Sequence, residues 1–260
     1  FEERPEQIAA FLCRKLYRAF IYEAPDEALV AELAQVMRAN DFAIAPVVRA
    51  LLKSAHFFDE QVIGAQVKSP VAMLAGFLSE LHLGELPPNV FLQLNRTAFL
   101  LQQSLLDPPN VAGWEGHHAW LNTTTMPLRW LVTQSILFGD RTQDGLNLRP
   151  LATLLLQRDG VDPATPASVF DLAVAMAEHL LPTPLAVLDL NAPAEDFAGD
   201  LEGNPLPPAV TSAPQHERDL AKIFLAGVPW YEWNLDQPEA GFLLNNFIRY
   251  LTSLPEFQLT

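Results

Sequence analysis

Cysteine is almost absent from this chain, since Cys13 is the only one among 260 residues. An intrachain disulfide is therefore impossible, and a metal site built from several cysteines is excluded. The histidines do not predict a metal site either, because no His-x-x-x-His spacing occurs. The chain also has no Gly-rich phosphate loop and no Gly-x-Ser-x-Gly nucleophile elbow. We therefore expect no metal and no cofactor.

Long hydrophobic runs and positive charge are scarce as well. No apolar run reaches the roughly 18–20 residues that a membrane span requires, because the best stretch, 70–83, contains Ser79, Glu80 and His82. The chain has only 16 Lys and Arg residues but 31 Asp and Glu residues, which gives a formal net charge of −15. An acidic surface repels phosphate backbones and anionic lipids, so we expect neither nucleic acid nor a membrane as a partner.

Helical periodicity dominates what is present, and half of the residues are apolar. Ile8, Leu12, Leu16 and Phe20 recur at helical spacing after Pro5, which predicts an amphipathic helix over about 5–22. Similar stripes predict five further helices, each of which begins at a cap or a first-turn proline. They run from Asp26 to about 37, from Pro46 to about 52, from Ser69-Pro70 to about 83, from Pro88 to about 106 and from Pro127 to about 137. Others are expected near 147–157, 166–181, 214–226 and 238–254.

These patterns predict an all-α protein of roughly nine or ten helices in one compact body. We expect a single domain over 1–260, with a possible subdivision into 1–139 and 140–260. Residues 182–213 are rich in proline and lack periodicity, which predicts a long irregular connection that either wraps the body or is mobile. The chain begins at Phe1 without a signal-peptide pattern, so we expect a portion of a longer protein.

A tryptophan-rich central loop breaks the helical pattern between about 107 and 126. Breaks of this kind tend to mark a site or a structural keystone. Its candidate binding residues, together with an arginine just beyond it, are Asn110, Trp114, His117, His118, Trp120, Asn122 and Arg129. No third ligand accompanies the adjacent histidines, so we expect no metal there.

Two interpretations of this loop remain open. Trp114 and Trp120 could offer a stacking platform for sugar rings, with the asparagines and histidines as hydrogen-bonding groups. Alternatively, the tryptophans bury large areas against the helices while the asparagines satisfy backbone groups in turns. In the second interpretation we expect Asn110 and Trp114 to hold the loop against the helices and His117 and His118 to form its exposed tip.

Lys15 is the least expected side chain of the first helix, because it falls near the middle of the apolar stripe. A lysine on a buried face must snorkel, pair with a carboxylate or lose its proton. We expect its stem to pack in the core and its ammonium to reach a carboxylate or carbonyl, while a functional lysine is the alternative.

A second aromatic cluster consists of Trp230, Tyr231 and Trp233, just before the last helix. Burial against the helical body is the expected arrangement. A hydrophobic lid or docking patch is the alternative.

Several motifs resemble the bacterial domain-of-unknown-function family 1800, in particular its C-terminal portion. The resemblance rests on the segments Ile8–Phe20, Leu51–Phe58, Lys68-Ser69-Pro70, Pro108–Trp114, Trp120-Leu121-Asn122, Arg129 and Ser253–Leu259. It implies an exported, often multidomain bacterial protein that is frequently encoded beside a protein similar to the sulfatase and alkaline phosphatase superfamily. The family carries no established activity, and its N-terminal portion would precede Phe1.

We therefore expect a noncatalytic binding or accessory module in the periplasm, at the cell surface or outside the cell, which engages a protein or a glycan. The alternative is a hydrolase-like enzyme that acts on a polysaccharide or cell-surface substrate at residues 110–129. A solvent-facing cleft over Trp114 and Trp120 with paired carboxylates would favour the enzyme, and buried rings would favour the module.

Overall fold

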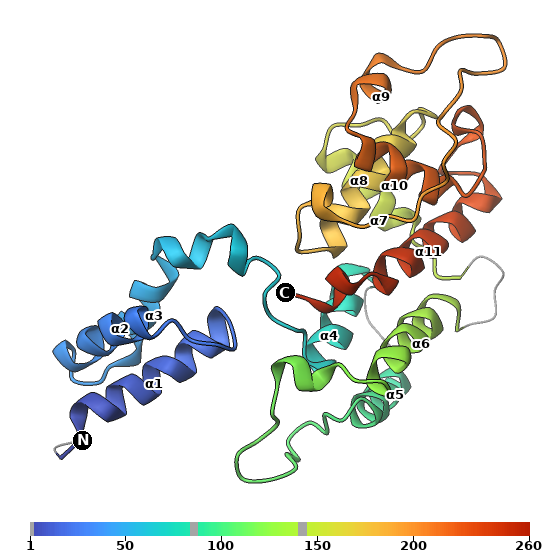
Figure 1. Ribbon diagram of the computed structural model, residues 1–260. Coiled ribbons are helices and arrows are strands. Elements are labelled where there is room, and N and C mark those ends of the chain that lie inside the picture. The colour runs from blue at the N-terminus through green and yellow to red at the C-terminus, as the bar shows by residue number, and fades with distance from the viewer. Residues whose placement is uncertain (1–2, 84–87, 140–144) are drawn as a thin grey trace. The chain divides into compact units, whose positions relative to one another are not determined.

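The prediction of an all-α protein is confirmed. A computed structural model describes residues 3–83, 88–139 and 145–260 (Figure 1). Within these ranges the secondary structure is helical apart from one isolated β-bridge, between Val67 and Leu259. The chain forms two compact units: a smaller unit of residues 1–67 and 259–260, and a larger unit of residues 68–258.

The smaller unit is a three-helix assembly. It consists of α1 (Pro5–Phe20), α2 (Glu27–Ala39) and α3 (Ile44–Leu52), followed by the 3-10 turns η1 (Ala55–Phe58) and η2 (Glu60–Val62). The predicted cap is confirmed, because the Asp26 carboxylate accepts hydrogen bonds from the backbone N–H groups of Ala28 and Leu29 at 2.8 and 3.3 Å. Its hydrophobic core includes Ala9, Cys13, Tyr17, Val30, Leu33, Met37, Val47 and Leu51.

The larger unit contains the remaining helices. They are α4 (Pro70–Glu80), α5 (Pro88–Leu100), α6 (Thr125–Phe138), α7 (Arg149–Arg158), α8 (Ser168–Leu180), α9 (Pro208–Ser212), α10 (Gln215–Leu225) and α11 (Pro238–Ser253). The short 3-10 turns are η3 (His117–Trp120), η4 (Leu185–Val187), η5 (Trp230–Glu232) and η6 (Pro255–Gln258). The short α9 lies inside the stretch that was expected to be irregular throughout.

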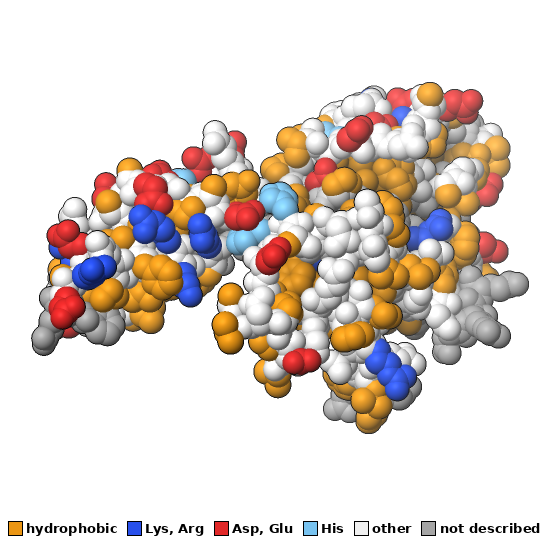
Figure 2. Space-filling model, turned by 60° about the horizontal axis from the view of Figure 1, so that its bottom comes forward, with side chains coloured by type: hydrophobic (Ala, Val, Ile, Leu, Met, Phe, Trp, Pro, Cys, Tyr) orange, Lys and Arg blue, Asp and Glu red, His pale blue; other side chains and the backbone are white. Residues whose placement is uncertain are grey.

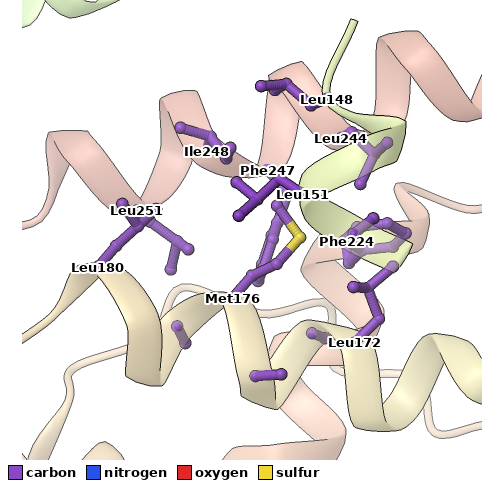
Figure 3. Packing of buried hydrophobic residues seen from close by; sticks show 14 of the residues in the cluster. Leu148, Leu151, Leu172, Met176, Leu180, Phe224, Leu244, Phe247, Ile248 and Leu251 are labelled. Atoms are coloured by element: carbon purple, nitrogen blue, oxygen red, sulfur yellow. The ribbon is translucent and has the colours of Figure 1, made fainter. Parts of the chain in front are cut away.

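Helix α11 is central to the core of the larger unit, because it contacts α6, α7, α8 and α10. Figure 3 shows residues of α7, α8, α10 and α11, together with Leu148 just before α7, meeting in one cluster: Leu148, Leu151, Leu172, Met176, Leu180, Phe224, Leu244, Phe247, Ile248 and Leu251. Burial of such side chains contributes about 1.5–3 kcal/mol each. The large apolar face of α11 therefore holds these helices together.

One buried polar contact fixes the segment that enters α7. Asn245 of α11 donates to the Leu146 carbonyl at 2.7 Å and accepts from the Leu146 backbone N–H at 3.2 Å. Gly145 precedes this contact with a φ of +74°, and a Cβ there would lie 2.7 Å from Asn245 Cγ and from the Leu137 carbonyl oxygen. The position therefore requires glycine for both its conformation and its close packing.

The proline-rich connection wraps the larger unit. Leu185 is buried, and Leu188, Leu190 and Phe197 pack partly against the core. The rings of Phe197 and Phe170 meet edge to face with centroids 4.9 Å apart. These apolar contacts hold the connection against the larger unit.

The boundary between the units falls between Val67 and Lys68, where the sequence predicted no subdivision. The possible subdivision at 139/140 lies inside the larger unit, because α11 packs on α6 before that position and on α7 after it. None of the helices in the described ranges has the length and apolar character needed to cross a bilayer.

Candidate functional site

The central loop, which follows α5, starts earlier than the sequence predicted. The helix was expected to reach Leu106, but it ends at Leu100, and Gln102 has a φ of +70°. Gln103 then turns its side-chain carbonyl oxygen toward α4, where it accepts the first-turn N–H of Val71 at 2.8 Å. A first-turn N–H has no partner within its own helix. The apolar periodicity gave no sign of this contact between two helices.

Asn110 forms a local turn and lies exposed. Its carboxamide oxygen accepts the backbone N–H of Ala112 at 2.8 Å, and its carbonyl accepts the N–H of Gly113 at 3.1 Å. The expectation that Asn110 holds the loop against the helices is therefore wrong. The side chain shapes the loop tip instead, as asparagine commonly does in turns.

Trp120, rather than Trp114, anchors the loop in the larger unit. Trp120 is only 8% exposed, whereas Trp114 is half-buried. His118 is exposed as expected, but His117 is half-buried and has a φ of +47°. Trp120 ends the 3-10 turn η3, and the Trp120 carbonyl is tied to the start of α6. Those contacts fix the backbone at Trp120.

Asn122 caps α6. Its carboxamide oxygen accepts the N–H groups of Thr124 and Thr125, both at 2.9 Å, and the Thr125 hydroxyl accepts the Asn122 N–H at 3.0 Å. The same hydroxyl donates to the Trp120 carbonyl at 2.8 Å. This reciprocal arrangement resembles a capping box and satisfies donors that the first turn leaves without partners.

Arg129 is fully buried on α6 and contacts only neutral groups in the described structure. Its guanidinium donates to the Lys68 carbonyl at 2.9 Å and to the Gln258 side-chain oxygen at 3.1 Å, and it lies 3.6 Å from the Met73 sulfur. Burial lowers the pKa of Arg129 to about 10. Arg129 therefore joins the residues that begin and end the larger unit, since Lys68 N–H also donates to the Gln258 carbonyl at 2.7 Å.

Two further charged groups of the larger unit are partly buried. The Lys68 ammonium lies 4.5 Å from the centroid of the Phe257 ring, and burial lowers the pKa of Lys68. Burial likewise raises the pKa of Glu80, although the positive charges of Lys68 and His179 partly oppose this rise. One carboxylate oxygen of Glu80 is buried without a hydrogen-bond partner in the described structure.

Lys15 lies in the smaller unit and is exposed, so the prediction of a core position is wrong. Its ammonium lies over the Phe11 ring, 4.9 Å from the centroid. The buried face of α1 is formed by Ala9, Cys13 and Tyr17, one step around the helix from the expected stripe. Phe11 is itself largely exposed, so Lys15 shields an aromatic ring from solvent instead of entering the core.

The sequence-predicted residues do not gather into a catalytic centre. Trp120, Asn122 and Arg129 lie buried or engaged at the start of α6, while Asn110 and His118 are exposed on the loop. Across the described ranges, no three His, Cys, Asp or Glu side chains approach one another as a metal ion would require.

An apolar groove lies between α4 and α5, near the loop. It encloses about 440 Å³ and is lined by Val71, Leu74, Ala75, Leu78, Ser79, Phe91, Leu94, Asn95, Ala98 and Leu105. None of these side chains is charged. Phe91 and Leu105 are 58% and 56% exposed at the groove. Periodicity predicted the apolar face of α5, but it did not predict that Phe91 and Leu105 are exposed.

The surface around the groove is also apolar. Further exposed side chains on α5 and in the loop are Leu92, Phe99, Leu100, Leu106 and Val111. Figure 2 brings forward the end of the larger unit that carries α5 and the loop, and hydrophobic side chains outnumber charged ones on that face. Large exposed apolar patches on soluble proteins commonly mark interaction sites.

The chain is thus an all-helical protein with an apolar groove between α4 and α5. Residues 3–259 match the family described as Protein of unknown function (DUF1800), so the chain belongs to that family. No curated protein and no solved structure matches the chain significantly.

Proposed function

We propose that this chain is a noncatalytic binding or accessory module of an exported bacterial protein, and that the groove between α4 and α5 receives an apolar helical segment of a protein partner. The uncharged lining of the groove carries this proposal. An amphipathic helix that lays its apolar face into a hydrophobic groove is a common mode of recognition.

The chemistry of the lining favours a protein over a glycan at this surface. Ser79 and Asn95 supply the only polar side chains, so a sugar would leave most of its hydroxyl groups without partners. Leucine or phenylalanine side chains from a partner would instead bury apolar area against Leu78, Phe91 and Leu94. A protein similar to the sulfatase superfamily, the neighbour that the family resemblance suggests, is a candidate source of such a helix.

The loop geometry supports a module over a hydrolase. Trp120 is buried, and the Asn122 side chain accepts backbone N–H groups of α6. Arg129 is engaged with a carbonyl and a carboxamide inside the larger unit. These residues therefore shape the loop and its anchorage, and a substrate at 110–129 would meet few polar groups that are not already committed.

A designed helical peptide tests the groove directly. The probe carries leucine at positions i, i+3, i+4 and i+7, with uncharged polar residues elsewhere and a fluorescent label. Fluorescence anisotropy should give a dissociation constant on the order of 10 µM, typical of a transient interface. Phe91→Asn should weaken binding at least about tenfold, because it removes a large apolar wall of the groove.

Leu201→Asn is the matched control, because Leu201 is also a large exposed apolar residue of the larger unit but does not line the groove. This variant should bind the peptide as the parent does. Equal binding by the Phe91→Asn variant, or equal loss in both variants, would refute recognition at the groove.

A further inference from the structure

A small cavity lies between α6 and α11 of the larger unit. It encloses about 280 Å³, near the lower end of the usual range for small-ligand sites. Its lining consists of Trp130, Thr133, Gln134, Arg249, Tyr250 and Ser253. None of these residues lines the groove between α4 and α5, so the cavity is a separate candidate site.

Several polar groups of this lining are hydrogen-bond donors that the fold does not use. Among the described residues, no hydrogen-bond or ion-pair partner meets the Arg249 guanidinium, the Trp130 indole N–H or the Gln134 carboxamide. By contrast, Arg149 of the same unit donates to the Leu235 carbonyl at 3.0 Å. The donors of the cavity therefore remain available to a ligand that supplies acceptors.

The charge of the lining differs from that of the whole chain. Within the described part of the chain, Arg249 is the only charged side chain of the lining, although Asp and Glu residues outnumber Lys and Arg residues 31 to 16 overall. Asp189 and Glu256 act electrostatically on Tyr250, but neither lines the cavity. The planar guanidinium fork of Arg249 can therefore take an oxyanion from a ligand.

Trp130 supplies a large apolar surface to the same cavity, because its side chain is 42% exposed. The two helices that carry the lining pack against each other and are also joined by a buried contact. The Thr252 hydroxyl of α11 donates to the Thr133 oxygen at 3.3 Å, and the Thr133 hydroxyl donates to the Trp130 carbonyl at 3.0 Å. Walls that are held in place before a ligand arrives lower the entropic cost of binding.

From these groups we propose that the cavity binds a compact organic anion, in which a carboxylate, sulfate or phosphate group is attached to a flat ring. The oxyanion pairs with the Arg249 guanidinium, and the Gln134 carboxamide adds a donor. The ring packs on the Trp130 side chain. A cation would meet the like charge of Arg249 and find no carboxylate among the described lining residues.

Nuclear magnetic resonance of the indole groups provides the test. The protein is labelled with ¹⁵N and titrated with benzoate, phenyl sulfate and phenyl phosphate, and separately with benzamide, which is neutral and close to benzoate in shape. At least one anion should shift the Trp130 indole N–H signal in a saturable manner, with a dissociation constant on the order of 1 mM. Benzamide should cause no saturable shift at the same concentrations. Trp130→Phe assigns the signal among the five tryptophans.

Arg249→Gln removes the charge without disturbing the fold, because Arg249 is exposed. In the same titration, this variant should bind the tightest of the three anions at least about tenfold more weakly than the parent does. Arg96→Gln is the matched control, because Arg96 is an exposed arginine of the same unit that does not line the cavity, and it should bind like the parent. The proposal is overturned if none of the three anions moves the Trp130 signal, if benzamide binds as tightly as benzoate, or if Arg249→Gln binds like the parent.

Discussion

Three charged side chains of the larger unit are withdrawn from solvent to different degrees. Arg129 is fully buried among a carbonyl, a carboxamide and a thioether, while Lys68 and Glu80 are half-buried. Burial disfavours the charged form in each case, so it lowers the pKa of Arg129 and Lys68 and raises the pKa of Glu80. Burial of each of these groups therefore lowers the stability of the folded protein at any pH at which the group is ionised.

Glu80→Gln should increase stability at neutral pH. Burial raises the folded-state pKa of Glu80 above the ordinary value of 4.5, so the folded protein binds the proton more readily than the unfolded chain does. The parent should therefore lose stability as the pH rises from about 4.5 through the raised pKa, and the variant should not show this loss. Thermal melts at pH 4 and pH 7 should show equal midpoints at pH 4 and a higher midpoint for the variant at pH 7.

The matched control for that experiment is Glu195→Gln, because Glu195 is an exposed carboxylate of the same unit. Its melting midpoint should follow the parent at both pH values. A lower midpoint for Glu80→Gln at pH 7 would contradict this prediction, because the attraction of Glu80 to Lys68 and His179 would then outweigh the cost of burial.

Individual residues were harder to place from the sequence than helices were. Lys15 lies beside the apolar stripe of α1, and a small rotation of the buried face was enough to expose it. Trp120 rather than Trp114 is buried, and the Thr125 hydroxyl donates to the Trp120 carbonyl, a contact that no local pattern indicated. Long-range contacts such as that of Arg129 with Lys68 and Gln258 leave no local pattern in a single sequence.

Helices and their starting points could be predicted because the signals are local. Ser69 accepts the Ala72 N–H at 3.2 Å, and Pro70 begins α4, as the sequence indicated. Helix ends were less predictable. The apolar pattern of α5 continues to Leu105, but Gln103 binds the first turn of α4 and the chain leaves the helix after Leu100.

Gly145→Ala tests the junction between α6 and α7. The new Cβ would adopt a φ of +74° and lie 2.7 Å from Asn245 Cγ, so the substitution should destabilise the larger unit by about 2–4 kcal/mol. Gly160→Ala is the matched control, because Gly160 has the same φ of +74° and a Cβ there would meet no atom within 4 Å. It should cost only about 1 kcal/mol. Similar losses in denaturant melts would contradict the close-packing argument.

For the whole molecule, the net charge contrasts with the uncharged lining of the groove. The chain carries a net charge of −15, but the lining of the groove between α4 and α5 has no charged side chain. Net charge of this size opposes self-association, which an exposed apolar groove would otherwise favour. The central loop, in this account, supports the larger unit through Trp120, and the groove binds the partner.

The most direct test of that division of roles combines a melt with a binding measurement on one variant. Trp120→Ala should destabilise the larger unit by about 3–5 kcal/mol, as large-to-small core changes do. At a temperature where the variant is still folded, it should bind the groove peptide within about twofold of the parent. If Trp120→Ala melts like the parent but no longer binds the peptide or a sugar, the loop is a recognition site and the account is wrong.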